Sequence, residues 1–167
     1  MFTVLNELER EGVIKRYALG GAMALLFYAE PRETLDADVF VFLPETKNGF
    51  EVLTPLWHAL RSRGYAWEGE GLIRIEGIPV QFLPPPSDLV EEAIKEARVI
   101  TYQGVQAKVF HLEHLFAIML ELNRPKDRER ILGLLEEHVK IDDQRLHTIL
   151  IRHGLQKKWE KVIEKTD

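Results

Sequence analysis

The sequence predicts an α/β (α+β) protein, in which a mixed β-sheet flanked by helices is followed by a C-terminal helical extension. Short apolar strands alternate with amphipathic helices in the first half of the chain, whereas only helical periodicity continues after residue 111. The cluster Pro84-Pro85-Pro86 separates the halves, because proline fixes φ and lacks a backbone donor. We expect an α/β core over residues 1–110 and a helical region over 111–167. The helical region should pack on the α/β core, since about 55 residues rarely build an independent hydrophobic core.

Composition excludes several classes of protein. The 167 residues are 46% hydrophobic and contain no cysteine, which argues against a disordered chain, a disulfide framework, a thiol nucleophile or a cysteine metal site. The 22 basic and 27 acidic residues give a net charge of −5, which disfavours a bulk-basic nucleic-acid binder. No apolar run reaches the roughly 18 residues that cross a bilayer, and the N-terminus does not resemble a signal peptide. We therefore expect a cytoplasmic protein without a membrane partner.

The first elements follow from hydrophobic spacing. Residues 2–11 place apolar side chains on one helical face, and residues 17–19 predict a short strand that runs into Gly20-Gly21. Residues 22–29 are apolar all round, as in a buried helix. Residues 39–43 form a continuous apolar run, which predicts a central strand buried on both faces.

A helix is predicted over residues 46–63, then a strand over 65–68 and a hairpin. The hairpin joins residues 73–76 to 79–83 through Gly77-Ile78, because glycine at the first loop position suits a type II′ turn. This register would set Arg74 opposite Gln81.

The second half is mostly helical. Ser87 is expected to cap a helix, and Gln103-Gly104 to join the two strands of a hairpin. Pro125 suits the first position of a helix. His111 and His114 lie three apart but have no third metal ligand within reach along the sequence, so we expect no metal there. The four helices expected at the end cover residues 112–122, 125–139, 142–153 and 155–165.

The chemistry-bearing stretch surrounds Asp36 and Asp38. Residues two apart at the start of a strand point to the same face, where two carboxylates repel unless a cation lies between them. Carboxylate oxygens suit Mg²⁺ or Mn²⁺. Gly20-Gly21 precedes a helix, where backbone can approach a phosphate closely, and Arg32 and Thr34 lie in the loop before the aspartates. The stretch therefore predicts a metal and phosphate site.

The sequence contains, in this order, a strand, Gly-Gly, a helix, Arg-x-Thr, Asp-x-Asp and a second strand. With this arrangement it resembles the nucleotidyltransferase superfamily to which DNA polymerase β belongs. The likeness is closer to its small prokaryotic members, the minimal nucleotidyltransferases and the AbiEii/AbiGii-type toxins, and covers residues 17–138. Residues 109–115 and 124–128 are similar to the helix pair of these proteins, which carries a Lys-Asp signature.

The resemblance implies roles for individual residues. Asp36 and Asp38 would be catalytic and ligate Mg²⁺ or Mn²⁺, and Gly20 and Gly21, with Arg32 and Thr34 nearby, would bind the phosphates of a nucleoside triphosphate. A hydroxyl would attack the α-phosphate and pyrophosphate would leave. Lys126 and Asp127 would support the wall of the active site.

One departure from the family pattern concerns its third carboxylate, since Gln81 occupies the best candidate position. An amide is a weaker metal ligand than a carboxylate and cannot act as a base. Under the predicted hairpin register, Glu76 would lie close enough to Gln81 to compensate.

Three hypotheses therefore remain open. In the first, the chain is an enzyme whose acceptor is a protein, a tRNA or a small molecule. In the second, it is a degenerate member of the family that binds a nucleotide or a partner without transfer. In the third, it is a toxin–antitoxin component. A homodimer through the last helix is also compatible with the sequence.

Overall fold

A computed structural model describes the chain except residues 31–33, 35, 46–52, 70 and 165–167. Its first half contains α1 (Phe2–Arg10), β1 (Arg16–Leu19), α2 (Gly21–Leu25), β2 (Ala37–Phe42), α3 (Thr54–Ser62), β3 (Trp67–Gly69), β4 (Leu72–Ile75) and β5 (Ile78–Leu83). Its second half contains α4 (Asp88–Lys95), β6 (Arg98–Tyr102), β7 (Val105–Val109), α5 (Leu112–Leu122), α6 (Pro125–Glu136), α7 (Asp143–Arg152) and α8 (Gln156–Ile163).

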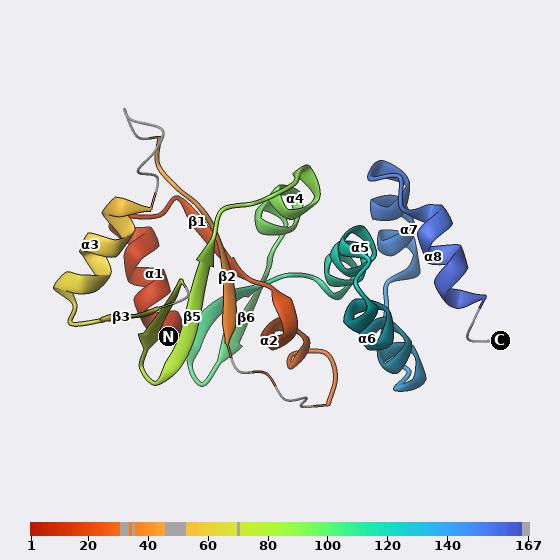
Figure 1. The fold of residues 1–167 in the computed structure, drawn as a ribbon, viewed down its shortest axis with the longest axis horizontal. Coiled ribbons are helices and arrows are strands. Elements are labelled where there is room, and N and C mark those ends of the chain that lie inside the picture. The colour runs from red at the N-terminus through yellow and green to blue at the C-terminus, as the bar shows by residue number, and fades with distance from the viewer. Residues whose placement is uncertain (31–33, 35, 46–52, 70, 165–167) are drawn as a thin grey trace.

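The strands form one seven-stranded mixed sheet in the order β3-β4-β5-β2-β1-β7-β6 (Figure 1). Helices α1 and α3 cover one face and α2 and α4 the other, and the α5–α8 helices stack beyond α2 and α4. The predicted fold class, a mixed sheet flanked by helices with a helical extension, is confirmed. Among the described residues, none of the helices is both long and apolar enough to cross a bilayer.

The central strand β2 positions the acidic pair. It pairs antiparallel with β1 and parallel with β5, and this parallel register sets Asp38 beside Gln81. Val39 and Val41 are fully buried, whereas Phe40 is only half-buried. The expectation of a strand buried on both faces is therefore wrong for one face.

The predicted hairpin register is also wrong. The turn is Glu76-Gly77, both with positive φ (51° and 86°), as in a type I′ turn, and Arg74 pairs with Pro79 and Leu72 with Gln81. Types I′ and II′ both match the right-handed twist of the flanking strands. Gly77 suits the second loop position of a type I′ turn as well as the first position of a type II′ turn, so glycine alone did not fix where the turn begins. Glu76 lies in this turn and pairs with the amino group of Met1 instead of reaching Asp38.

Two predicted helices are shorter in the structure. The apolar run 22–29 is helical only in α2 and then continues in turns, and α3 covers the end of the segment 46–63, whose residues 46–52 lie outside the described part.

Several local predictions are confirmed. Ser87 Oγ accepts the backbone N–H of Val90 (3.4 Å), and the hairpin turn is Gln103-Gly104. Pro125 is the first residue of α6. The Trp159 ring of α8 packs against Phe116 within the same chain, at a centroid distance of 5.8 Å. The homodimer stays a prediction.

Candidate functional site

Gly21 and Asp38 meet where β1 turns into α2. The backbone N–H of Gly20 donates to the carbonyl oxygen of Asp38 (2.9 Å), which joins the turn to β2. Gly21 has φ +60°, and a Cβ placed on it would lie 2.0 Å from Oδ2 of Asp38. Only a residue without a side chain therefore fits between the turn and this carboxylate.

The surroundings of Asp38 disfavour the charged form of its carboxyl group. Burial raises its pKa above the ordinary value, and the nearby negative charge of Asp36 raises it further. Arg124, Lys126 and Arg130 of the α6 segment oppose this shift, so three cations lie near the acidic pair. Perturbed carboxylates in a cleft are typical of catalytic and binding sites.

The other sequence-predicted residues divide into three groups. Gln81 lines the same cleft as Asp38. Thr34 Oγ1 donates to the carbonyl oxygen of Asp36 (3.3 Å), so Thr34 supports the loop before the aspartates. Arg32 lies outside the described residues, and Glu76 is remote from the site for the reason given above.

Asp127 is a buried anchor at the start of α6. Its carboxylate accepts from the guanidinium of Arg124 (2.6 and 3.0 Å) and from the backbone N–H of the same residue (3.3 Å). Arg124, Asp127 and Arg130 all line the cleft. Our sequence reasoning missed the two arginines, although their spacing of three residues from Asp127 places all three on one helical face.

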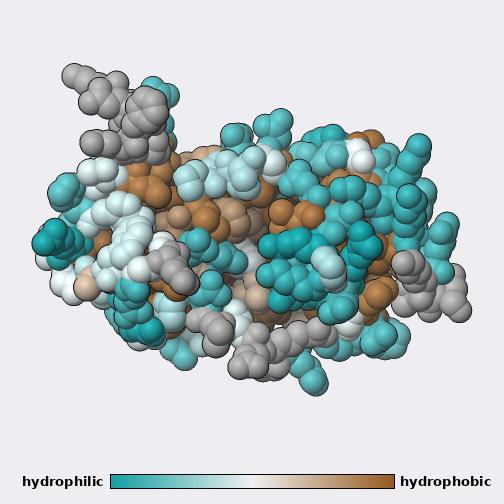
Figure 2. All heavy atoms as spheres, viewed as in Figure 1, coloured by the Kyte–Doolittle hydropathy of each residue, from teal (hydrophilic) through white to brown (hydrophobic). Residues whose placement is uncertain are grey.

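The cleft has a volume of about 350 Å³ and a largely apolar lining. Figure 2 shows apolar side chains exposed between the sheet half and the helical half of the molecule. Besides the polar residues named above and Glu121, the lining consists of Gly21, Leu25, Phe40, Leu83, Pro84, Pro86, Val90, Phe110, Leu115, Ile118, Met119 and Leu122.

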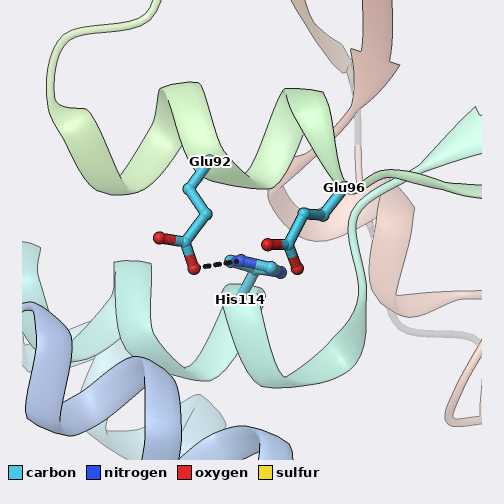
Figure 3. Close-up of side chains that lie close together, drawn as sticks. All are labelled: Glu92, Glu96 and His114. Carbon is cyan, nitrogen blue, oxygen red and sulfur yellow. Dashed lines mark hydrogen bonds and ion pairs between the residues drawn. The ribbon is translucent and has the colours of Figure 1, made fainter.

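A second polar cluster lies away from this cleft. Glu92 and Glu96 of α4 face the buried His114 of α5, and the ligand atoms of the three residues lie within 4.8 Å of one another (Figure 3). Our sequence reasoning found no third ligand for His114, because these glutamates come from another helix.

The contacts of this second cluster are those of a structural network. Glu92 accepts from His114 (3.2 Å) and pairs with Arg152 and His153, and its pKa falls to about 2 against the cost of its burial. Glu96 pairs with Arg145 (2.6 Å). The carboxylates of Glu92 and Glu96 thus pair with two guanidinium groups, so their charges balance without a metal. The network connects α4 to α5 and α7.

The acidic pair beside the cleft has the donor chemistry of a Mg²⁺ or Mn²⁺ site. Asp36 and Asp38 supply hard carboxylate oxygens, and Gln81 adds an amide oxygen beside Asp38. Burial and, after it, repulsion from Asp36 raise the pKa of Asp38, and a bound divalent cation would relieve that repulsion. The residues present therefore fit such a cation.

No family model matches the chain, and no curated protein matches its sequence. Its structure is similar to that of an antigenic nucleotidyltransferase-like protein from Paracoccidioides brasiliensis, with a TM-score of 0.56, 15% identity, and 98% of this chain and 89% of that chain covered. A putative nucleotidyltransferase from Thermotoga maritima gives a TM-score of 0.47 at 19% identity, over 81% of this chain and 89% of that one. The structure of ANT(2")-Ia in complex with adenylyl-2"-tobramycin gives a TM-score of 0.47 at 15% identity, over 96% of this chain and 91% of that one. The first of these similarities shows that the chain has the nucleotidyltransferase fold.

Proposed function

We propose that the chain transfers a nucleoside monophosphate from a nucleoside triphosphate to a hydroxyl acceptor, with Mg²⁺ or Mn²⁺ held by Asp36 and Asp38. The observation that carries the proposal is the half-buried carboxylate of Asp38, which lies against Gly21 and close to Asp36 and to the three cations of the α6 segment. The nucleotidyltransferase fold supports the reaction class by analogy only.

The chain's own residues would divide the work. Gly20 and Gly21 let the turn into α2 pack directly against Phe40, Phe110 and Asp38. Arg124, Lys126 and Arg130 offer positive charge to a triphosphate. A bound divalent cation would stabilise the negative charge that develops on the attacking and leaving oxygens. Asp38 is the group that we assign to accept the hydroxyl proton, since the amide of Gln81 cannot.

A transfer assay tests this proposal. The protein is incubated with α-labelled ATP, GTP, CTP or UTP, Mg²⁺ or Mn²⁺, and cell extract, beside the variant Asp36→Ala/Asp38→Ala. Label transferred by the wild type alone is the expected result. Equal labelling by both proteins, or none with any nucleotide, contradicts the proposal.

The second candidate function is binding without transfer, and Gln81 favours it because it replaces the family's third carboxylate beside Asp38. The AbiEii-type subfamily and a toxin–antitoxin role also remain proposals, based on the sequence alone.

Gln81→Glu tests the choice between transfer and binding alone. We expect the variant to transfer label about tenfold faster than the wild type, because a carboxylate binds a divalent cation more strongly and can accept a proton. The measurement is the initial rate of label transfer as the Mg²⁺ concentration varies. If the wild type is silent and only the variant transfers label, the natural chain is the binding-only form.

A further inference from the structure

The cleft beside Asp38 has a polar end and an apolar compartment. Gly21, Asp38 and Gln81 form the polar end, whereas β2, β5, α4 and α5 contribute the apolar walls. The rings of Phe40 and Phe110 stack at a centroid distance of 5.2 Å and form part of these walls. The compartment therefore begins directly beside the proposed reaction centre.

The wall that α5 contributes is a regular stripe. Leu115, Ile118, Met119 and Leu122 follow one another at i, i+3, i+4 and i+7, so they lie on one face of the helix and line the cleft together. Ile118 is only half-buried, which leaves part of its side chain available to a ligand. A cleft of about 350 Å³ lies at the small end of the range of small-molecule sites.

One carboxylate in this compartment has no described cationic partner. Both oxygens of Asp127 are bonded to Arg124, whereas Glu121 accepts one hydrogen bond from Ser87 Oγ (2.9 Å) and forms no ion pair within the described part of the chain. Lys158 Nζ donates to the backbone carbonyls of Leu120 and Glu121 (3.1 and 3.2 Å), which fixes the end of α5. The Glu121 carboxylate is thus held at the cleft wall and can receive a donor from a ligand.

We propose that this compartment binds the acceptor of the transfer reaction, and that the acceptor is a small, mainly apolar molecule with a hydroxyl group and one hydrogen-bond donor or positive charge. The inference rests on the proposed function. The hydroxyl reaches Asp38, and the donor faces Glu121. A polycationic acceptor does not suit a cleft bordered by Arg124 and Arg130.

The reaction balances without a further reagent. The hydroxyl oxygen of the acceptor forms a bond to the α-phosphorus, the bond from that phosphorus to the bridging oxygen of pyrophosphate breaks, and the hydroxyl proton passes to Asp38. The products are a phosphodiester of the acceptor and pyrophosphate.

The first test locates the label. Cell extract is separated by ultrafiltration into small molecules and macromolecules, and each fraction is incubated with the wild type, the labelled nucleotide and Mg²⁺. We expect label in the small-molecule fraction, in products that pass into butanol more readily than the nucleotide. Label in protein or RNA overturns the acceptor class but leaves the transferase proposal standing.

The second test fills the compartment. Ile118→Trp should lower transfer to the small-molecule fraction by about tenfold or more, because the larger ring occupies the space of the acceptor. Binding of the α,β-methylene analogue of the same nucleotide should change less than about twofold. Leu132→Trp, in α6 and outside this cleft, is the matched control and should change neither quantity.

A conservative variant separates recognition from packing. Glu121→Gln keeps the shape of the side chain and should raise KM for the labelled acceptor about tenfold, with KM for the nucleotide unchanged. Loss of analogue binding in Ile118→Trp would assign the compartment to the nucleobase and overturn the proposal. If no fraction is labelled and the analogue does not bind the wild type, the proposed function itself fails.

Discussion

Asp38→Asn is expected to abolish nucleotidyl transfer and, at the same time, to raise the melting temperature of the protein. The loss of rate should reach about 10³-fold, because under the proposed function the substitution removes a charge that holds the metal and with it several kcal/mol of transition-state stabilisation. The gain in stability follows from the pKa of Asp38, which burial and Asp36 raise. The charged carboxylate is therefore unfavourable in the folded state. Asparagine carries no charge, so the substitution should raise the free energy of unfolding by about 0.5–2 kcal/mol.

The pH dependence gives the sign of this effect. A carboxyl group whose pKa is higher in the folded than in the unfolded state destabilises the fold above the folded pKa, and this penalty disappears below the unfolded pKa. The stability difference between Asp38→Asn and the wild type should therefore be largest at neutral pH and shrink as the pH falls. Thermal unfolding at a series of pH values measures it.

Asp127→Asn provides the contrast, because its carboxylate is buried but bonded to Arg124. The Arg124 side chain is half-exposed, so loss of the charged pair and weakening of the helix cap should destabilise the protein by about 1–2 kcal/mol. A destabilised Asp38→Asn would show instead that Asp38 is paired like Asp127, and would contradict its assignment as a strained functional carboxylate.

The sequence was sufficient to predict most of the individual strands and helices, whereas the roles of the site residues stay predictions. Hydrophobic periodicity predicts the β2 strand and the α5 helix, and both are found close to the expected residues. The resemblance associated Gln81 with the acidic pair, because the family's third carboxylate lies on a later strand. The parallel register of β2 and β5 sets Asp38 and Gln81 side by side.

Long-range contacts and turn chemistry could not be predicted. The turn at Glu76-Gly77 differs from the expected one by a single residue, yet that shift moves Glu76 out of reach of the acidic pair. Glu121 meets Ser87 across 34 residues, and His114 meets Glu92 across 22. Neither contact has a periodic signal, because each depends on how two helices dock.

Gly21→Ala is expected to destabilise the protein by about 2–4 kcal/mol and to abolish transfer. Alanine at φ +60° costs about 1–2 kcal/mol, and its Cβ would lie 2.0 Å from Oδ2 and 3.0 Å from Cβ of Asp38, so the carboxylate must move. Gly12→Ala is the control, since Gly12 has φ +73° but no atom within 4 Å of the added Cβ. It should show the backbone cost alone and retain transfer.

A double-mutant cycle tests whether the clash with Asp38 causes the difference. Asp38→Ala removes the oxygen that the new Cβ would meet, so the double variant Gly21→Ala/Asp38→Ala should be more stable than the sum of the single effects by about 1–2 kcal/mol. Denaturant unfolding of the four proteins measures this coupling. Simple additivity would mean that Gly21 is required only for its backbone conformation, whereas coupling would show that the glycine is what allows the β1–α2 turn to approach the carboxylate of Asp38.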